Sequence, residues 1–224
     1  AALANPRASG RALDVLRGVG ERPQSATRRR VPDSTFFIAL DTKHCHIELF
    51  DPACRAFYRA RLFDALERHG ARLHAYMLHV SEVQLLISAP TRRSLERLLE
   101  QVQRAYLSYF NQRFKRQVRA ARTHTSLCQL CGDGLIRETY RHIERRLLVV
   151  GESRKLGDSE WSSYPANAFG RGDASGRLPI RRLTRHRCLD KLMPQKAALA
   201  GYRDYLDKSP DPVFARFLET ALRE

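Results

Sequence analysis

The sequence contains no uninterrupted apolar run of about 18 residues, so we expect no membrane-spanning helix and no membrane partner. Cysteines number only five and lack the spacing of a disulfide framework, which predicts a reducing, cytoplasmic setting. The first 33 residues have no apolar signal core, which argues against secretion, although their arginine-rich composition is compatible with an organellar transit peptide. Acidic residues are also few, with 24 Asp and Glu against 40 Lys and Arg.

The basic excess consists almost entirely of arginine. The net charge is +16, and only six of the 40 basic residues are lysine. Arginine binds phosphate through two parallel hydrogen bonds and stacks its flat guanidinium on bases. The composition therefore predicts a polyanionic partner, most often nucleic acid, while solvated faces in an arginine-rich proteome remain the alternative explanation.

Composition divides the chain of 224 residues into three parts. Residues 1–33 form a basic arm with interspersed Gly, Pro and Ser. We expect one folded domain over residues 34–170, because 43% of the chain is hydrophobic and supports a core of ordinary size. Residues 171–224 read as a basic stretch followed by a helical extension.

The first elements follow from local signals. Thr35–Leu40 and Cys45–Phe50 are rich in β-branched and aromatic residues and predict a hairpin. Asp51 followed by Pro52 predicts a capped helix start, and Gly70 predicts the end of that helix.

The later elements complete a mixed pattern. Arg72–Val80 and Val83–Ala89 predict two strands, and a 3.6-residue apolar period from Ser94 predicts a long helix. A further helix is expected from Asp133 to Gly151. This order predicts an α+β fold, an antiparallel sheet with helices packed over it on a ferredoxin-like plan.

The long helix carries an unusual concentration of positive charge. Residues 91–122 hold nine Arg and Lys against two Glu, more than solubility requires. Phosphate contacts are therefore predicted for Arg92, Arg93, Arg97, Arg104, Arg113, Lys115, Arg116 and Arg119.

Several segments resemble the REP-associated tyrosine transposases of the HUH superfamily of single-strand DNA nucleases. Gly70–Leu78 with Val83–Leu86 is similar to the family's central strand region. Tyr106–Arg113 resembles its long helix, and Trp161–Gly170 matches a characteristic run. The resemblance implies an HUH transposase-like fold and a role in transposition on single-stranded or hairpin DNA.

The chemistry of this family requires two His flanking one hydrophobic residue on a strand, which together hold a divalent metal. It also requires a Tyr on a nearby helix, which attacks phosphorus. At the metal positions this chain has Glu82 and Gln84, and at the nucleophile position it has His142. The resemblance thus indicates a degenerate active site in which the groups that cleave DNA have been lost.

Alternatives to this loss remain open at the level of sequence. Oxygens of Glu82 and Gln84 are acceptable to Mg²⁺ or Mn²⁺, although a hydrogen-bonded polar pair is the simpler expectation, and no other cofactor is indicated. Tyr140 is a conceivable substitute nucleophile, but two helical residues separate it from position 142 by about 200°. Cys128 and Cys131 have zinc-ligand spacing without a second ligand pair.

The leading hypothesis is a nucleic-acid-binding relative of these transposases that binds single-stranded or hairpin DNA without cleaving it. One alternative is an active nuclease with a rewired site built on Glu82, Gln84 and either His142 or Tyr140. Another is a subunit recruited to bind RNA or protein.

Overall fold

A computed structural model describes residues 33–41, 51–118, 124–170, 183–190, 198–208 and 211–221. The chain forms a four-stranded antiparallel sheet in the order β2-β3-β1-β4. The strands are β1 (Ser34–Asp41), β2 (Arg72–Leu78), β3 (Glu82–Ala89) and β4 (His124–Leu130). Because α1 (Pro52–Arg68) joins β1 to β2 and α2 (Arg92–Phe114) joins β3 to β4, this is the ferredoxin-like βαββαβ arrangement. The predicted α+β fold is confirmed.

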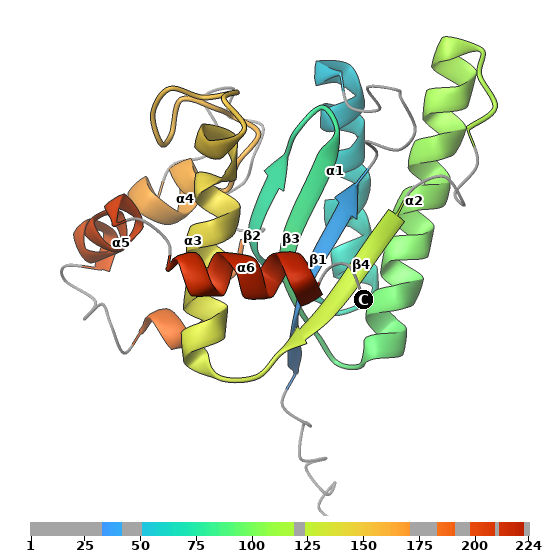
Figure 1. Ribbon diagram of the computed structural model, residues 1–224. Helices are drawn as coiled ribbons and strands as arrows, with labels where there is room; N and C mark the ends of the chain where they lie inside the picture. The colour runs from blue at the N-terminus through green and yellow to red at the C-terminus, as the bar shows by residue number, and fades with distance from the viewer. Residues whose placement is uncertain are drawn as a thin grey trace, which may run out of the picture. The chain divides into compact units, whose positions relative to one another are not determined.

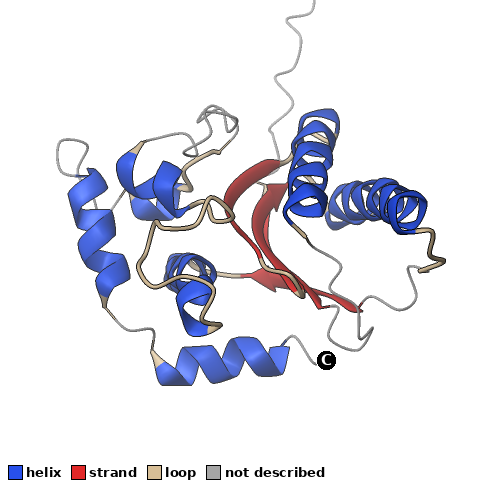
Figure 2. Ribbon diagram, turned by 90° about the horizontal axis from the view of Figure 1, so that it is seen from above, coloured by secondary structure: helices blue, strands red, loops and turns tan. Residues whose placement is uncertain are grey.

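Helices cover both faces of the sheet. Figure 2 shows α1 and α2 on one face, with the later helices on the other. The later helical elements are α3 (Asp133–Val149), α4 (Tyr164–Phe169), the short 3₁₀ turn η4 (Arg187–Leu189), α5 (Ala198–Asp207) and α6 (Pro212–Ala221). None of the described helices is both long and apolar enough to cross a bilayer.

The predicted helix boundaries are confirmed by their capping geometry. The Asp51 carboxylate accepts a hydrogen bond from the backbone N–H of Cys54 at 2.6 Å, and Pro52 is the first residue of α1. Gly70 follows α1 at φ +61°, and Gly151 follows α3 at φ +76°. Both lie in the left-handed region, which glycine enters without the steric cost that a Cβ imposes.

The predicted hairpin differs from the observed pairing of its first strand. Both edges of β1 are hydrogen-bonded, one to β3 and the other to β4. The expected second strand, Cys45–Phe50, lies outside the described residues, as do the arm of residues 1–32 and Arg119. The strand β2 ends at Leu78 rather than Val80, because the His79 N–H donates to the Glu82 carbonyl at 2.8 Å and turns the chain into β3.

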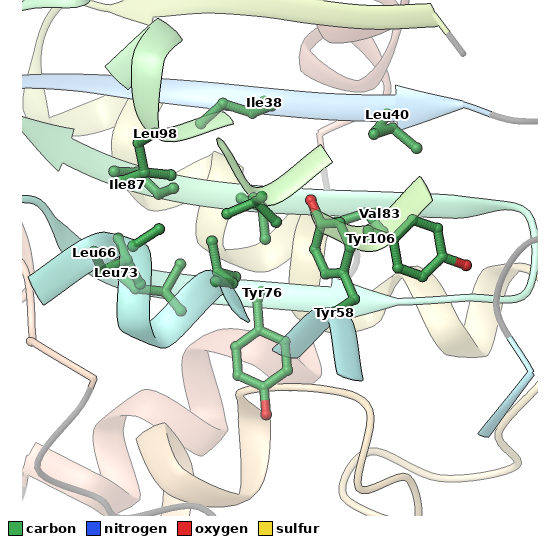
Figure 3. Close-up of a cluster of buried hydrophobic side chains, with 14 of the residues drawn as sticks. Ile38, Leu40, Tyr58, Leu66, Leu73, Tyr76, Val83, Ile87, Leu98 and Tyr106 are labelled. Carbon is green, nitrogen blue, oxygen red and sulfur yellow. The ribbon is translucent and has the colours of Figure 1, made fainter. Parts of the chain in front are cut away.

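The two faces of the sheet contribute to two different cores. Alternate residues of β1 point to opposite faces, so Ile38 belongs to the core under α1 and α2 while Phe37 belongs to the core under α3. Figure 3 shows the first core, in which Ile38 and Ile87 of the sheet meet Leu98 of α2. The strand side chains that face α3 include buried polar groups, namely Thr35, His74, Glu82, Gln84 and Ser88. The candidate chemistry therefore lies on the α3 face.

Candidate functional site

Glu82 and Gln84 lie together at the start of β3, on the face that packs against α3. Both side chains are buried, and the Glu82 carboxylate accepts hydrogen bonds from the Arg146 guanidinium at 2.5 and 2.9 Å. The Gln84 amide donates to the same carboxylate at 3.2 Å, while its buried Oε1 has no hydrogen-bond partner within the described part of the chain. Arg146 was not predicted, although it lies one helical turn after His142 and so faces the same way.

His142 lies close to this ion pair. Its ring meets the ring of Phe37 edge-on, with centroids 5.8 Å apart. The pKa of His142 is lowered to about 4, mainly by burial and also by the charge of Arg146, while Glu82 opposes the shift. His142 is therefore neutral at neutral pH, and the structure brings its half-buried side chain near Glu82.

Tyr140 points to a different part of the molecule. Its hydroxyl accepts a hydrogen bond from the backbone N–H of His186 at 3.1 Å, and its ring packs edge-on against Tyr202. The side chain is fully buried, and desolvation raises its pKa well above the usual value for tyrosine. The structure does not bring this hydroxyl together with Glu82 and Gln84.

The donor set at the start of β3 does not fit a divalent cation. Mg²⁺ and Mn²⁺ require several ligands with available lone pairs, and both oxygens of Glu82 already face the cationic Arg146. A dication at this position would be repelled by the guanidinium at close range. Within the described residues, no three His, Cys, Asp or Glu side chains are grouped as metal ligands.

A second cluster of charge lies beside the aromatic run that begins at Trp161. The Arg55 guanidinium pairs with Glu152 and lies 5.4 Å from the centroid of the Trp161 ring, while that of Arg59 lies 4.9 Å away. The Trp161 carbonyl accepts the N–H of Leu78 at 2.8 Å. The aromatic run is therefore hydrogen-bonded to the edge of β2, and the guanidinium groups of two arginines lie against the Trp161 ring.

Glu144 on α3 is a buried carboxyl, and no cationic side chain of the described residues lies within ion-pair distance of it. It accepts hydrogen bonds from Ser163, Asn167 and Tyr202, each at 2.7 Å. Desolvation raises its pKa to about 7, and the three hydrogen bonds oppose the shift. This carboxyl joins α3 to the aromatic run and to α5.

The predicted phosphate-binding side chains lie on the solvent side of α2 and at its C-terminal end. Arg93, Arg97 and Arg104 recur at intervals of four and seven residues, so they share one exposed line along the helix. No carboxylate of the described residues lies within ion-pair distance of these three, whereas Arg92 pairs with Glu96 and Arg113 with Asp51. Lys115 and Arg116 are exposed beyond the last turn. Figures 1 and 2 place α2 on the opposite face from α3.

The other end of the α3 face holds a chain of neutral hydrogen-bonding side chains. His186 Nε2 lies 3.2 Å from Thr35 Oγ1, which lies 2.8 Å from Ser88 Oγ. Ser88 Oγ in turn lies 2.7 Å from His74 Nε2. His74 is buried with both ring nitrogens hydrogen-bonded, and its ring packs edge-on against that of His186.

Backbone partners fix which ring nitrogen of His74 and of His186 donates a hydrogen bond and which accepts one. The His74 Nδ1–H donates to the Thr184 carbonyl at 2.5 Å, so Nε2 of His74 is the acceptor for Ser88. The backbone N–H of Cys188 donates to Nδ1 of His186 at 3.1 Å, so Nε2 of His186 donates to Thr35. Burial lowers the pKa of both imidazoles, to about 4 for His74, which keeps them neutral.

The hydrogen-bonded series of His186, Thr35, Ser88 and His74 borders a cavity of about 600 Å³ at the end of the sheet. The cavity is lined by the first residues of β1, β2 and α3, the last residues of β3 and β4, and the segment 184–187. Figure 1 shows η4, which includes Arg187, beside the first turn of α3. The cavity lies at the opposite end of β3 from Glu82.

The cysteine pair with zinc-ligand spacing does not form a described metal site. Cys128 lies on β4, Cys131 is exposed in the turn before α3, and both are free. Cys188 and His186 lie close together, but His186 is already engaged by the Cys188 backbone and by Thr35.

No family model matches the chain, and no curated protein matches it. Among solved structures, the chain is similar to one described as a REP-associated tyrosine transposase bound to a REP hairpin. The TM-score is 0.50 at 12% sequence identity, and the match covers 73% of this chain and 98% of that chain. The likeness shows a shared fold with a protein of the family that the sequence motifs resemble.

Proposed function

We propose that this protein binds nucleic acid, with single-stranded or hairpin DNA as its substrate class, and does not cleave the strand. The observation that carries the proposal is the exposed line of Arg93, Arg97 and Arg104 on α2. From Arg93 to Arg104 the helix rises about 16 Å, so the three guanidinium groups can contact phosphates along one strand. The fold-level likeness to a hairpin-bound transposase supports DNA as the partner.

Salt dependence tests the phosphate contacts. Neutralising about six phosphates predicts a log–log slope of affinity against salt near −4 on single strands. The double variant Arg97→Gln/Arg104→Gln should reduce the steepness of the slope by about 1.4, because each lost phosphate contact contributes about 0.7. Fluorescence anisotropy with a labelled DNA hairpin carrying a single-stranded extension measures both values.

A matched control separates the line on α2 from general charge. Arg154 and Lys155 are exposed in the turn after α3, so Arg154→Gln/Lys155→Gln removes the same charge elsewhere. We expect the control to keep the wild-type slope. A flat slope for the wild type, or equal losses in both double variants, would contradict binding through α2. Tighter binding to the matching RNA hairpin would favour an RNA-binding subunit instead.

The absence of cleavage is supported by the state of the residues at the family's catalytic positions. Glu82 is paired with Arg146, and His142 is half-buried and neutral. The Tyr140 hydroxyl is hydrogen-bonded to the backbone N–H of His186. Incubation with hairpin DNA and Mg²⁺ or Mn²⁺ should yield no covalent protein adduct on a denaturing gel. An adduct that disappears in His142→Ala or Tyr140→Phe would establish an active, rewired nuclease.

A further inference from the structure

The two edges of the sheet differ in what is bonded to them. At the β2 edge, the Leu78 N–H donates to the Trp161 carbonyl and the Thr184 N–H donates to the Leu73 carbonyl, each at 2.8 Å. At the other edge, β4 is hydrogen-bonded to β1, and no described strand lies beyond it. An edge strand can accept a further strand through its outward backbone groups. In the described part of the chain, β4 is therefore the edge at which a strand can be added.

A cavity of about 250 Å³ lies beside this edge, on the face that α1 and α2 cover. Its floor consists of two rows of side chains that cross β3, β1 and β4 in register, namely Leu85, Ile38 and Leu127 in one row and Val83, Leu40 and Thr125 in the other. The members from β3 and β1 are buried, whereas Leu127 is half-buried and Thr125 is exposed. Figure 3 shows Ile38, Leu40 and Val83 in the core. The apolar floor thus extends from the core to the outer strand.

The wall of this cavity comes from α2. Leu99 is half-buried and continues the apolar lining, while Arg92, Glu96, Glu100 and Gln103 add polar groups. Arg92 and Glu96 pair with each other at 2.9 Å. The arginine line on α2 lies outside this lining. An apolar centre bordered by polar groups is the usual anatomy of a protein–protein interface.

A strand added beside β4 brings every second side chain to the face of the cavity, because side chains alternate along a strand. It lies about 4.8 Å from β4, so its side chains extend the two rows that end at Leu127 and Thr125. Apolar residues at these alternate positions become buried between the floor and α2. The cavity therefore favours an extended segment with apolar residues two positions apart.

The charge of the chain indicates which kind of protein supplies this strand. The net charge is +16, so a second copy of this chain would bring together two strongly positive molecules. An acidic protein is attracted by the same field. We propose that β4 accepts an extended strand from an acidic partner protein, whose alternate apolar side chains enter the cavity between β4 and α2. This binding is separate from the proposed contact with nucleic acid.

A synthetic peptide tests the proposal on the full-length protein. The probe is a fluorescently labelled peptide of seven residues, the length of β4, in which leucine alternates with glutamate. Anisotropy titration should give a dissociation constant on the order of 10 μM. A scrambled peptide of the same composition, whose leucines no longer alternate, should bind about tenfold more weakly, and so should a peptide with lysine in place of glutamate.

Methylation of the peptide backbone tests the addition of a strand directly. The amides of alternate residues point to the same side of a strand, so the leucine amides and the glutamate amides face opposite sides. Of two peptides, one N-methylated at its leucines and the other at its glutamates, only one should lose about tenfold in affinity. Equal affinities of the two methylated peptides would overturn the strand addition.

A matched pair of variants tests the position of the site. Thr125→Trp places an indole over the cavity and should weaken peptide binding about tenfold, with affinity for the DNA hairpin changed by about twofold or less. Thr220→Trp makes the same substitution at an exposed residue of α6 and should leave peptide binding unchanged. Thermal unfolding midpoints near that of the wild type should confirm that both variants are folded.

The outcomes separate this proposal from its alternatives. Equal losses in the two tryptophan variants, or equal binding of the scrambled, lysine and alternating peptides, would overturn it. A wild-type dimer in sedimentation velocity that Thr125→Trp dissociates would also overturn it, because a second copy would then occupy the β4 edge. Failure to bind the DNA hairpin, with peptide binding retained, would contradict only the proposed nucleic-acid function.

Discussion

The two ends of the sheet face under α3 are both polar, but they satisfy their polar groups in different ways. Where β3 begins, the Glu82 carboxylate is neutralised by Arg146 of the same chain. Where β3 ends, Ser88 belongs to a chain of neutral hydroxyl and imidazole groups beside a cavity rimmed by arginine. A buried charge needs a counter-ion from within the protein, whereas a series of neutral hydrogen-bonded groups needs none.

The largest effect is expected when the Glu82–Arg146 ion pair, where β3 begins, is broken. Glu82→Ala leaves Arg146 partly buried without its carboxylate and should lower the free energy of unfolding by about 3–5 kcal/mol. Replacing both partners, as in Glu82→Leu/Arg146→Leu, should recover most of the loss because no uncompensated charge remains. Urea denaturation at neutral pH measures both. A loss below about 1 kcal/mol for the single variant would mean that the ion pair contributes little to the stability of the fold.

An intermediate effect is expected at Glu144, a buried carboxyl that contrasts with Glu82 and its cationic partner Arg146. Glu144 has hydrogen-bond donors but no cation, and its pKa is raised from 4.5 to about 7. Its contribution to stability is therefore complete below pH 4.5 and is lost as pH rises through about 7. Glu144→Gln mimics the protonated form, so it should be close to wild type at low pH and more stable by about 1–3 kcal/mol at alkaline pH.

The measurement is a pair of urea titrations of wild type and Glu144→Gln at each pH. Their difference isolates this carboxyl, because the depressed pKa values of His74 and His142 affect both proteins equally. A difference that does not change with pH would show that folding does not raise the pKa of Glu144.

The smallest effect is expected when the neutral hydrogen-bonded series is interrupted at Thr35. Thr35→Val removes the hydroxyl between His186 and Ser88 and should cost about 1–2 kcal/mol, because it leaves both neighbours short of a partner. Thr35→Ser keeps the hydroxyl and should cost less than about 1 kcal/mol. Guanidinium denaturation of the two variants provides the comparison, and equal costs would argue that the hydroxyl chain contributes nothing to stability.

Local signals in the sequence were sufficient for most of the fold. The Asp51–Pro52 start of α1 and the glycines after α1 and α3 were predicted because each acts on its own backbone. The pairing of β4 with β1 joins residues far apart in the sequence, so local signals do not specify it. The apolar periodicity of α3 placed His142 and Tyr140 on a helix, but it does not specify which side chains pack against each of them.

The candidate site was predictable only in part. The charge of α2 and its division into exposed and buried sides followed from composition and helical period. The pairing of Glu82 with Arg146 did not, although it decides whether a cation can bind at the start of β3. The cavity was not foreseen either, because His186 and Arg187 come from a segment whose position depends on contacts with three strands.

The sequence by itself determined the positive charge, the capped start of α1, the strands β2 and β3 and the long helix after them. It also placed Glu82, Gln84 and His142 where the transposase family that it resembles has metal-binding and nucleophilic residues. These are properties of composition and of neighbours along the chain. Only the tertiary structure decided that Arg146 neutralises Glu82, that Tyr140 turns toward His186, and that the α2 arginines lie on the face opposite α3. Such outcomes depend on the packing of segments distant in sequence, which local periodicity does not specify.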